Sequence, residues 1–337
     1  LGDLAMAGTL ADGMDRGRAA FLARTRPFAG LPPRQPAALW KKIADFQGLR
    51  GHSMTDRYGV IGHPISHSKS PVIHRLFADA TRQDLSYDAI DIPPEDLAPR
   101  VRQLIADGYR GLNVTVPHKT EVVRLTSRLT SRAELAGAVN TLIVHADGAV
   151  EGDNTDGAGL VNDLRQNLRT RLAGTRILIL GAGGATRGIV PALFDTNPRD
   201  IMVANRTLDR AQALARDFRM LGRILACQFQ ELGGQRFDLV INATSAGLKG
   251  EMPPFPASIL GPETLCYDLS YAMQDTPFVA WAKMNGAGRV AQGWGMLVEQ
   301  AAESFFAWRG VRPDTRPVIA KLPGSPGATD TMRKRLA

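Results

Sequence analysis

The chain has 337 residues, of which 44% are hydrophobic and 22% charged, and this length suggests about two globular domains. Its formal charge of +8 is concentrated at the ends, because residues 1–53 carry +4 and residues 319–337 carry +3, which leaves +1 for the rest. These features argue against a nucleic-acid surface on the folded part and against a membrane span of about 18 apolar residues, and the two lone thiols, Cys227 and Cys266, argue against a disulfide framework or zinc site.

The two ends of the chain differ in composition from the middle. Residues 1–53 contain clusters of Gly, Pro and Arg with one short helix predicted near 37–46, and they lack the apolar region of a secretory signal. Asp3, Asp12 and Asp15 count against a transit peptide. We therefore expect a disordered N-terminal extension, a functional protein that begins at Met54, and a disordered tail at 319–337.

The middle of the chain opens with alternating strand-like and helix-like segments. Strands are predicted at 57–62, 85–92, 111–116 and 139–145, and helices at 71–81, 95–106 and 156–168. This βαβ rhythm predicts a mixed or parallel sheet covered by helices.

A second block with the same rhythm begins at Thr175. Strands are predicted at 175–180, 200–204, 238–242 and 264–268, and helices at 185–194, 208–218, 276–285 and 295–308. The chain is therefore predicted to be an α/β protein with two domains and a deep cleft between them. The first domain is expected at 54–158, completed by a returning helix within 291–318, and the second, a Rossmann-like nucleotide-binding domain, at 159–290.

A glycine-rich turn lies between the first strand and the first helix of the second block. Gly181 permits a tight turn, and Gly183 lets the backbone approach a pyrophosphate at the helix N-terminus. Thr186 stands where the strict dinucleotide fingerprint has its third glycine, so the strand–turn–helix context carries the interpretation.

The end of the next strand favours NADP(H) over NAD. An NAD enzyme usually has an acidic residue there to hold the ribose, whereas this chain has Asn205, Arg206 and Thr207, with Asn205 21 residues after Gly184. A guanidinium at Arg206 can form a charge-assisted bond to the 2′-phosphate, and Arg210 can add a second cation one helical turn later.

Three polar motifs in the first block are difficult to explain by packing. Ser-His-Ser-Lys-Ser-Pro at 66–71 places hydroxyls at a helix start, which suits a carboxylate ligand. Asn-Val-Thr-Val-Pro-His-Lys at 113–119 ends a strand, and Gly-Asp-Asn-Thr-Asp-Gly at 152–157 is rich in acids and side-chain acceptors. An ordinary helix cap and a simple turn are the alternatives for the first and third motifs.

From Tyr58 to Val318, the ordered set of motifs resembles the shikimate dehydrogenase family. Besides the glycine turn and the three motifs above, the set comprises Ala-Val-Asn-Thr at 138–141, Asn-Arg-Thr at 205–207, Asn-Ala-Thr-Ser-Ala-Gly at 242–247, Tyr-Asp-Leu-x-Tyr at 267–271 and Gly-Met-Leu-Val-Glu-Gln at 295–300. The resemblance implies NADPH-dependent reduction of 3-dehydroshikimate to shikimate in aromatic amino-acid biosynthesis.

The resemblance also implies roles at matching positions. Lys119 and Asp156 match the catalytic dyad, in which the ammonium stabilises charge on the carbonyl oxygen and can supply its proton. The positions that match substrate ligands are Ser68, Ser70, Thr115, Lys119, Asn140, Asp156, Tyr271 and Gln300. Those that match the cofactor site are Gly181, Ala182, Gly183, Gly184, Ala185, Asn205, Arg206, Thr207, Arg210, Thr244, Ser245, Leu269, Gly293 and Met296.

Three other interpretations stay open. Ser68 and Arg206 argue against a relative with quinate or NAD activity. The Lys119–Asp156 pair argues against a catalytically silent NADP-binding protein. The serine loop argues against a folate-type dehydrogenase. We expect a cytoplasmic monomer or homodimer that takes a small-molecule substrate, with no metal, nucleic acid or membrane partner. No role is assigned to His63, His67 or His118.

Overall fold

The computed structural model describes residues 55–244 and 255–321. The predicted helix near 37–46, the expected start at Met54, Ser245 and the tail beyond residue 321 lie outside the described residues. The predicted disordered tail began too early, because Ile319 lies in a short helix, α11 (Arg316–Ile319), and its neighbour Val318 is buried.

The first sheet is six-stranded, with strand order β2-β1-β3-β5-β6-β4. β1 pairs in parallel with β2 and β3, whereas β5 runs antiparallel to β3 and β6. The strands are β1 (Asp56–Gly62), β2 (Leu85–Asp91), β3 (Tyr109–Val114), β4 (Arg128–Leu129), β5 (Thr141–Val144) and β6 (Val150–Asp153). The connecting helices are α3 (Ser70–Thr81), η1 (Pro94–Asp96), α4 (Leu97–Ala106), η2 (Glu121–Leu125) and α5 (Ser131–Ala136). The mixed sheet confirms the prediction for this block.

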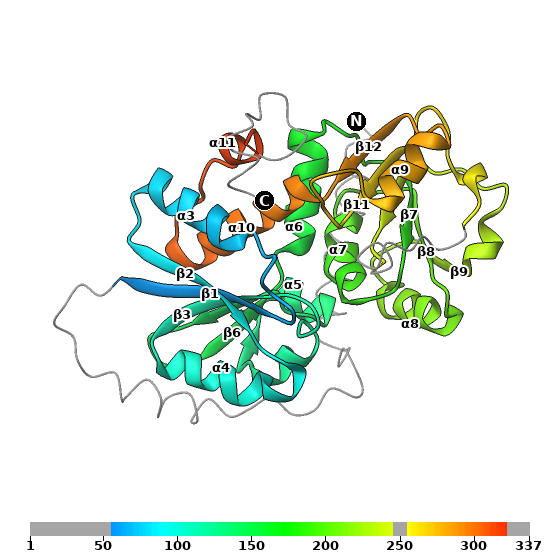
Figure 1. The fold of residues 1–337 in the computed structure, drawn as a ribbon. Coiled ribbons are helices and arrows are strands. Elements are labelled where there is room, and N and C mark those ends of the chain that lie inside the picture. Colours follow the sequence, from blue (N-terminus) through cyan, green and yellow to red (C-terminus); the bar gives the residue numbers. More distant parts are fainter. Residues whose placement is uncertain (1–54, 245–254, 322–337) are drawn as a thin grey trace, which may run out of the picture. The chain divides into compact units, whose positions relative to one another are not determined.

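Each face of the first sheet is covered by a different layer. On one face, Val101 and Leu104 of α4 pack with Leu112 and Val114 of β3 in one apolar core (Figure 1). A second cluster joins α3 to the long helix α10 (Trp294–Arg309), and Tyr58 of β1 stacks on Trp308 of α10. α10 therefore packs against the first sheet.

The second sheet is also six-stranded and is parallel throughout, in the order β12-β11-β10-β7-β8-β9. Its strands are β7 (Arg176–Leu180), β8 (Asp200–Ala204), β9 (Ile224–Cys227), β10 (Leu239–Asn242), β11 (Leu265–Asp268) and β12 (Arg289–Gln292). Its helices are α7 (Gly184–Phe194), α8 (Leu208–Phe218), η4 (Phe229–Leu232), η6 (Ala257–Ile259) and α9 (Pro277–Met284). This is the strand order of a doubly wound dinucleotide-binding fold, with its switch point between β7 and β10.

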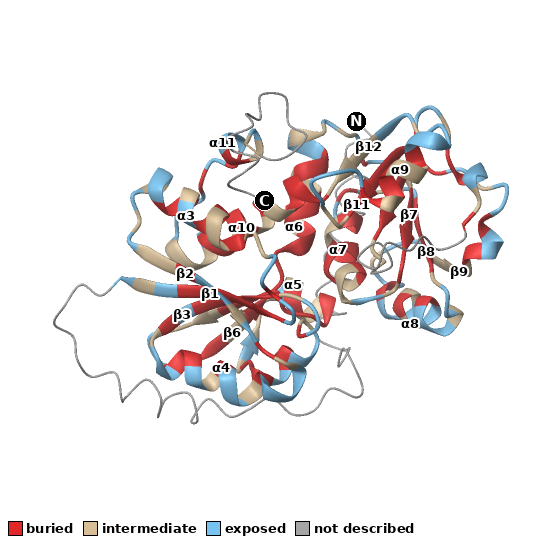
Figure 2. Cartoon of the chain, viewed as in Figure 1, coloured by how far each residue is buried: buried red, intermediate tan, exposed pale blue. Residues whose placement is uncertain are grey.

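Alternate residues of each strand in the second sheet enter different cores, since successive side chains of a strand point to opposite faces. Ile177 and Ile179 pack with α7 and α8, whereas Leu178 and Leu180 pack with η4 and α9. Burial on both faces explains why these strands are continuous apolar runs in the sequence. Figure 2 shows this burial along β7 and its neighbours.

Two helical segments connect the sheets. α6 (Asp156–Asn162) leads toward β7 and continues as a π-helical turn, η3 (Asp163–Asn167), where a single helix had been predicted. α10 leads back from β12 and packs along α6 (Figure 1). No helix among residues 55–244 and 255–321 is long and apolar enough to cross a membrane.

The histidine of α3 is expected to make the fold sensitive to acid. His74 is fully buried and stacks on Tyr87 with 4.2 Å between the ring centroids, and burial lowers its pKa to about 3. The unfolded chain binds this proton near pH 6.5, so stability is lost as the pH falls below that value. Between pH 8 and pH 5, this group should remove about 2 kcal/mol from the free energy of unfolding.

A His74→Phe variant should lack this component, because phenylalanine keeps a stacked ring without a titrating group. Urea unfolding of both proteins at pH 8 and pH 5 measures the difference, with replacement of the exposed His63 by glutamine as the control. An equal pH dependence in wild type and His74→Phe would contradict the assignment.

Candidate active site

The candidate site is built on the ends of β1 and β3, which lie side by side. Val60 pairs with Asn113, and the backbone N–H of Thr115 donates to Ile61 O at 2.9 Å. The Asn113 side chain is buried, and its Oδ1 accepts from the Tyr87 hydroxyl at 2.7 Å. These bonds hold the end of β3 and direct the following loop.

The serine loop leads from β1 to the N-terminus of α3. Ser70 is the buried first residue of α3, and its N–H donates to Ser68 Oγ at 3.3 Å. Pro71 occupies an early helical position, where its missing N–H costs nothing, and the first turn contains no acidic residue. Two hydroxyls at a helix N-terminus form an environment that favours an anion.

Lys119 and Asp156 form an ion pair with 2.5 Å between Nζ and Oδ2. Lys119 is held through its backbone oxygen, which accepts from Val139 N at 2.8 Å. Asp156 is the first residue of α6, and its backbone N–H donates to Asn154 Oδ1 at 3.1 Å. The lysine side chain is 18% exposed and the aspartate 5% exposed, so the ammonium faces the outside of a mostly buried pair.

A buried amide joins this pair to α10. Asn140 Nδ2 donates to Asp156 Oδ1 at 2.8 Å and approaches Gln300 Oε1 at 3.3 Å. Asn140 Oδ1 accepts from the backbone N–H of Thr155 at 2.9 Å, which fixes the orientation of the amide. The Asn140 side chain, directly before β5, thus links α6 and α10 in one network.

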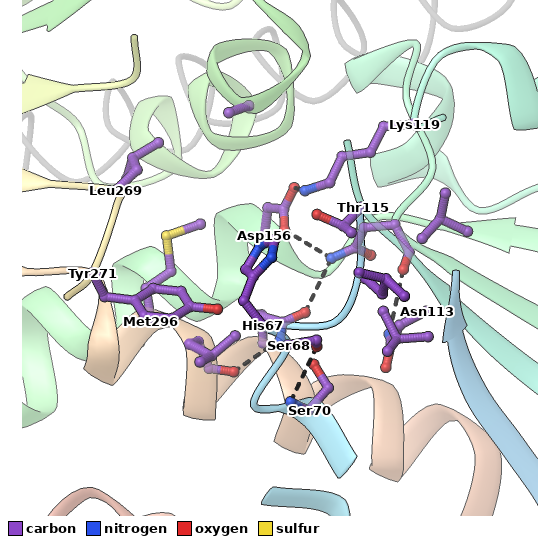
Figure 3. A pocket seen from close by; sticks show the side chains of 18 residues that line it. His67, Ser68, Ser70, Asn113, Thr115, Lys119, Asp156, Leu269, Tyr271 and Met296 are labelled. Atoms are coloured by element: carbon purple, nitrogen blue, oxygen red, sulfur yellow. Dashed lines mark hydrogen bonds and ion pairs between the residues drawn. The ribbon is translucent and has the colours of Figure 1, made fainter. Parts of the chain in front are cut away.

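All predicted substrate residues line one cavity of about 200 Å³ (Figure 3). The ring centroids of Tyr271 and Trp294 lie 4.5 Å apart, and burial raises the pKa of the Tyr271 hydroxyl. The lining residues predicted from the sequence are Ser68, Ser70, Thr115, Lys119, Asn140, Asp156, Ala185, Leu269, Tyr271, Gly293, Met296 and Gln300. The cavity therefore combines the three motifs of the first block with residues of α7, of the loop after β11, and of α10 and its cap.

The glycine-rich turn stands at the end of β7, next to this cavity. Gly181 has a φ of +103°, and a Cβ there would lie 3.1 Å from the carbonyl of Ala243, so only glycine suits the turn. A Cβ on Gly183 would meet nothing within 4 Å, which leaves an open approach to the N-terminus of α7. Thr186 at the third glycine position donates its hydroxyl to Gly181 O at 2.8 Å, so the departure from the strict fingerprint stabilises the turn.

The arginine segment follows β8 beside this turn. Gly181 N donates to Ala204 O at 2.8 Å, which places the residues after β8 next to the glycine-rich turn. Arg206 and Arg210 are exposed, and neither forms a salt bridge with another described residue. Asn205 Nδ2 donates to Thr207 O at 2.8 Å. The segment offers two cations and no acidic group before Asp209, so it fits a phosphate.

The remaining predicted cofactor residues do not reach the cavity. Gly181, Ala182, Gly183 and Gly184 lie in the turn after β7, and Thr244 lies after β10, where its Cγ2 would be 3.3 Å from a Cβ on Gly181. Ser245 is outside the described residues. Together these positions follow the carboxyl edge of the second sheet, where nucleotides bind in this fold.

Some residues that line the cavity have no predicted role in the sequence analysis. His67, Asn113 and Leu297 also line the cavity; each lies within one of the motifs described above, but none of them is predicted as a site residue. His118, next to Lys119, turns away: it is buried, and its Nε2 lies 2.7 Å from Ile92 O. In the part of the chain that the structure describes, no cluster of His, Cys, Asp or Glu is placed to hold a metal ion.

Three family models match parts of the chain between residues 60 and 322. They are described as the shikimate dehydrogenase substrate binding domain at residues 60–142, shikimate / quinate 5-dehydrogenase at 163–249 and the shikimate 5'-dehydrogenase C-terminal domain at 293–322. The NADP(+) shikimate dehydrogenase of Methylococcus capsulatus is 55% identical over 267 residues, which are 79% of this chain and 96% of the relative.

Solved structures show the same similarity. An Ael1 enzyme from Pseudomonas putida superimposes with a TM-score of 0.75 at 44% identity, covering 81% of this chain and 100% of that one. Shikimate 5-dehydrogenase from Thermus thermophilus, in complex with NADP(H) and shikimate, has a TM-score of 0.71 at 31% identity, covering 84% and 100%.

Proposed function

The chain belongs to the shikimate dehydrogenase family, and on this premise we propose that it catalyses the NADPH-dependent reduction of 3-dehydroshikimate to shikimate. One observation carries the proposal: the Lys119–Asp156 pair, with 2.5 Å between its charged atoms, lies in the wall of a cavity that all the predicted substrate residues line. The reaction belongs to the synthesis of aromatic amino acids.

Different polar side chains of the cavity would bind different groups of the substrate. The Ser68 and Ser70 hydroxyls, at the N-terminus of α3, suit the substrate carboxylate. Asn140 and Gln300 carry amide groups that can bind ring hydroxyls, and the network around Asn140 orients both. A site that pairs each substrate hydroxyl discriminates strongly against analogues that lack one.

The dyad would carry out the proton transfer. Bound NADPH supplies the hydride that reduces the ketone carbon. Lys119 stabilises the charge that develops on the oxygen and supplies its proton, while Asp156 orients the ammonium. Asn140 bonds the other oxygen of Asp156, so the carboxylate keeps a single orientation.

The cofactor would lie along the carboxyl edge of the second sheet. The open approach to Gly183 suits the pyrophosphate, and Arg206 with Arg210 suits the 2′-phosphate. We infer a substrate domain at 54–158 completed by 291–318, and a cofactor domain at 159–290. The strands of the first sheet fall within 54–158, and those of the second within 159–290 except for the last two residues of β12.

The initial rate of cofactor reduction tests the proposal, with shikimate or quinate as substrate and NADP⁺ or NAD⁺ as acceptor. We expect a fast rate only for shikimate with NADP⁺. Comparable rates with quinate or NAD⁺ would assign the chain to a branch of broader specificity. No rate with any pair would favour a catalytically silent NADP-binding protein.

We also propose a cytoplasmic location and a monomeric or homodimeric state without a nucleic-acid partner. Cys227 and Cys266 are unpaired and buried, and burial raises their pKa values to about 11 and about 12, so both behave as inert small apolar groups. Unpaired thiols are compatible with a reducing compartment.

A further inference from the structure

A buried carboxylate outside the dyad has only neutral partners. Asp163, the first residue of η3, is 3% exposed and forms no salt bridge with a described residue. Its Oδ2 accepts from the Tyr267 hydroxyl at 2.6 Å and its Oδ1 from Asn167 Nδ2 at 2.9 Å. Burial raises its pKa, so the folded protein holds this charge at a cost in stability.

The N-terminus of α10 supplies the missing compensation. This helix begins after Gly293, which has no side chain to cap it, and its first turn contains no acidic residue. The Asp163 carboxylate lies against this first turn, and its interaction with the backbone of Met296 opposes the rise in pKa that burial causes. A negative charge at a helix N-terminus is favourable, and more so when the charge is partly buried.

The contact between Asp163 and α10 depends on a glycine. A Cβ on Gly295 would lie 1.9 Å from Asp163 Oδ1, so no side chain can stand there while the carboxylate keeps its place. Further along, a Cβ on Gly159 of α6 would lie 2.6 Å from Gln300 Cβ. α6 with its π-helical extension and α10 are therefore in close contact at two points, through the Asp163 side chain at Gly295 and through the Gln300 backbone at Gly159.

Asp163 thus contacts two elements that supply residues to one wall of the cavity: α10, at Gly295, and β11, at Tyr267. Gly293, Met296 and Gln300 of that wall belong to α10 or its cap, and Leu269 follows β11, which carries Tyr267. Asp156 lies on α6, directly before η3.

We infer that Asp163 is a positioning residue of the active site. It holds the first turn of α10 and the end of β11 against α6, and so sets Met296 and Gln300 relative to Asp156. This inference rests on the proposed function, because the wall it positions is the one that would contact shikimate and NADP(H).

An Asp163→Ala variant tests the inference. We expect the KM for shikimate and the Kd for NADP⁺ to rise at least about tenfold, because a shift of the wall by a fraction of an ångström misplaces its contacts. An Asp163→Asn variant should stay within about threefold of wild type, since its amide can donate to the Tyr267 hydroxyl oxygen and accept from Asn167 Nδ2. Rates and calorimetric NADP⁺ titrations are measured at a temperature where each variant is folded.

The matched control is Asp200→Ala. Asp200 is also a buried carboxylate, paired with Arg176, but it stands at the start of β8, at the opposite end of the strands from the cavity. Its loss should lower stability and leave the KM and Kd within about twofold. The same small change in a folded Asp163→Ala variant would overturn the inference.

Two further measurements keep the inference falsifiable. If Asp163→Ala does not fold, Tyr267→Phe removes one donor and keeps the buried ring; an unchanged KM and Kd in that variant would overturn the inference. The Kd for NADP⁺ needs no turnover. A wild-type chain that bound NADP⁺ without reducing it would contradict the proposed function, while the effect of Asp163 on binding would still be decided.

Discussion

Replacement of Lys119 by alanine is expected to lower the turnover of shikimate by at least about a hundredfold, with a much smaller change in its KM. The ammonium lies in the cavity wall, 2.5 Å from Asp156 Oδ2, and Lys119 is the only Lys or Arg that lines the cavity among the described residues. Its charge is needed most when the substrate oxygen becomes negative, so its loss affects the transition state more than the bound substrate.

Initial rates at saturating NADP⁺, over a range of shikimate concentrations, separate the two parameters. Lys283→Ala is the control, because Lys283 lies on α9, forms an exposed ion pair with Asp275 and does not line the cavity. Lys119→Arg keeps a positive charge but hardly releases a proton, and should remain strongly impaired. Equal turnover in wild type and Lys119→Ala would remove Lys119 from the mechanism.

The central strands of both sheets could be predicted because buried strands have a recognisable pattern of apolar residues in the sequence. β10 is buried along its whole length and β7 from its second residue onward, and apart from Arg176 and Asn242 both are continuous apolar runs. β9 and β12, at the two edges of the second sheet, were missed. β12 has the sequence Arg-Val-Ala-Gln and no fully buried residue, so it is a strand only through its hydrogen bonds to β11. Such pairing depends on residues distant in sequence.

The site residues also divide into those that could be predicted from the sequence and those that could not. Motifs identified Lys119 and Asp156, and the structure brings them together through the end of β6 and the start of α6. The support of Asn113 could not be predicted, because its partners are Tyr87 on β2 and Ser304 on α10, 191 residues away. A tyrosine in a strand and a serine within a helix have no local pattern that distinguishes a buried hydrogen-bond partner from a packing residue.

The second large effect is expected at the cofactor site, where Arg206→Ser should reduce kcat/KM for NADP⁺ about 10- to 100-fold. A charge-assisted hydrogen bond to a phosphate contributes about 1.5–3 kcal/mol, and this cation has no salt bridge in the described part of the chain that could compete. The rate with NAD⁺ should change less than about twofold, because NAD⁺ lacks the 2′-phosphate. Rates with both cofactors at saturating shikimate give the two values.

A matched variant separates a specific contact from general loss of positive charge. Arg187 lies on α7, close to the glycine-rich turn, but it is paired with Asp217 at 2.6 Å. Arg187→Ser should therefore affect NADP⁺ and NAD⁺ alike, whereas Arg206→Ser should affect NADP⁺ alone. If Arg206→Ser lowered both rates equally, the arginine would stabilise the end of β8 rather than read the phosphate. Selectivity for NADP⁺ would then have to come from Arg210, the next cation along α8, and Arg210→Ser would show the loss specific to NADP⁺.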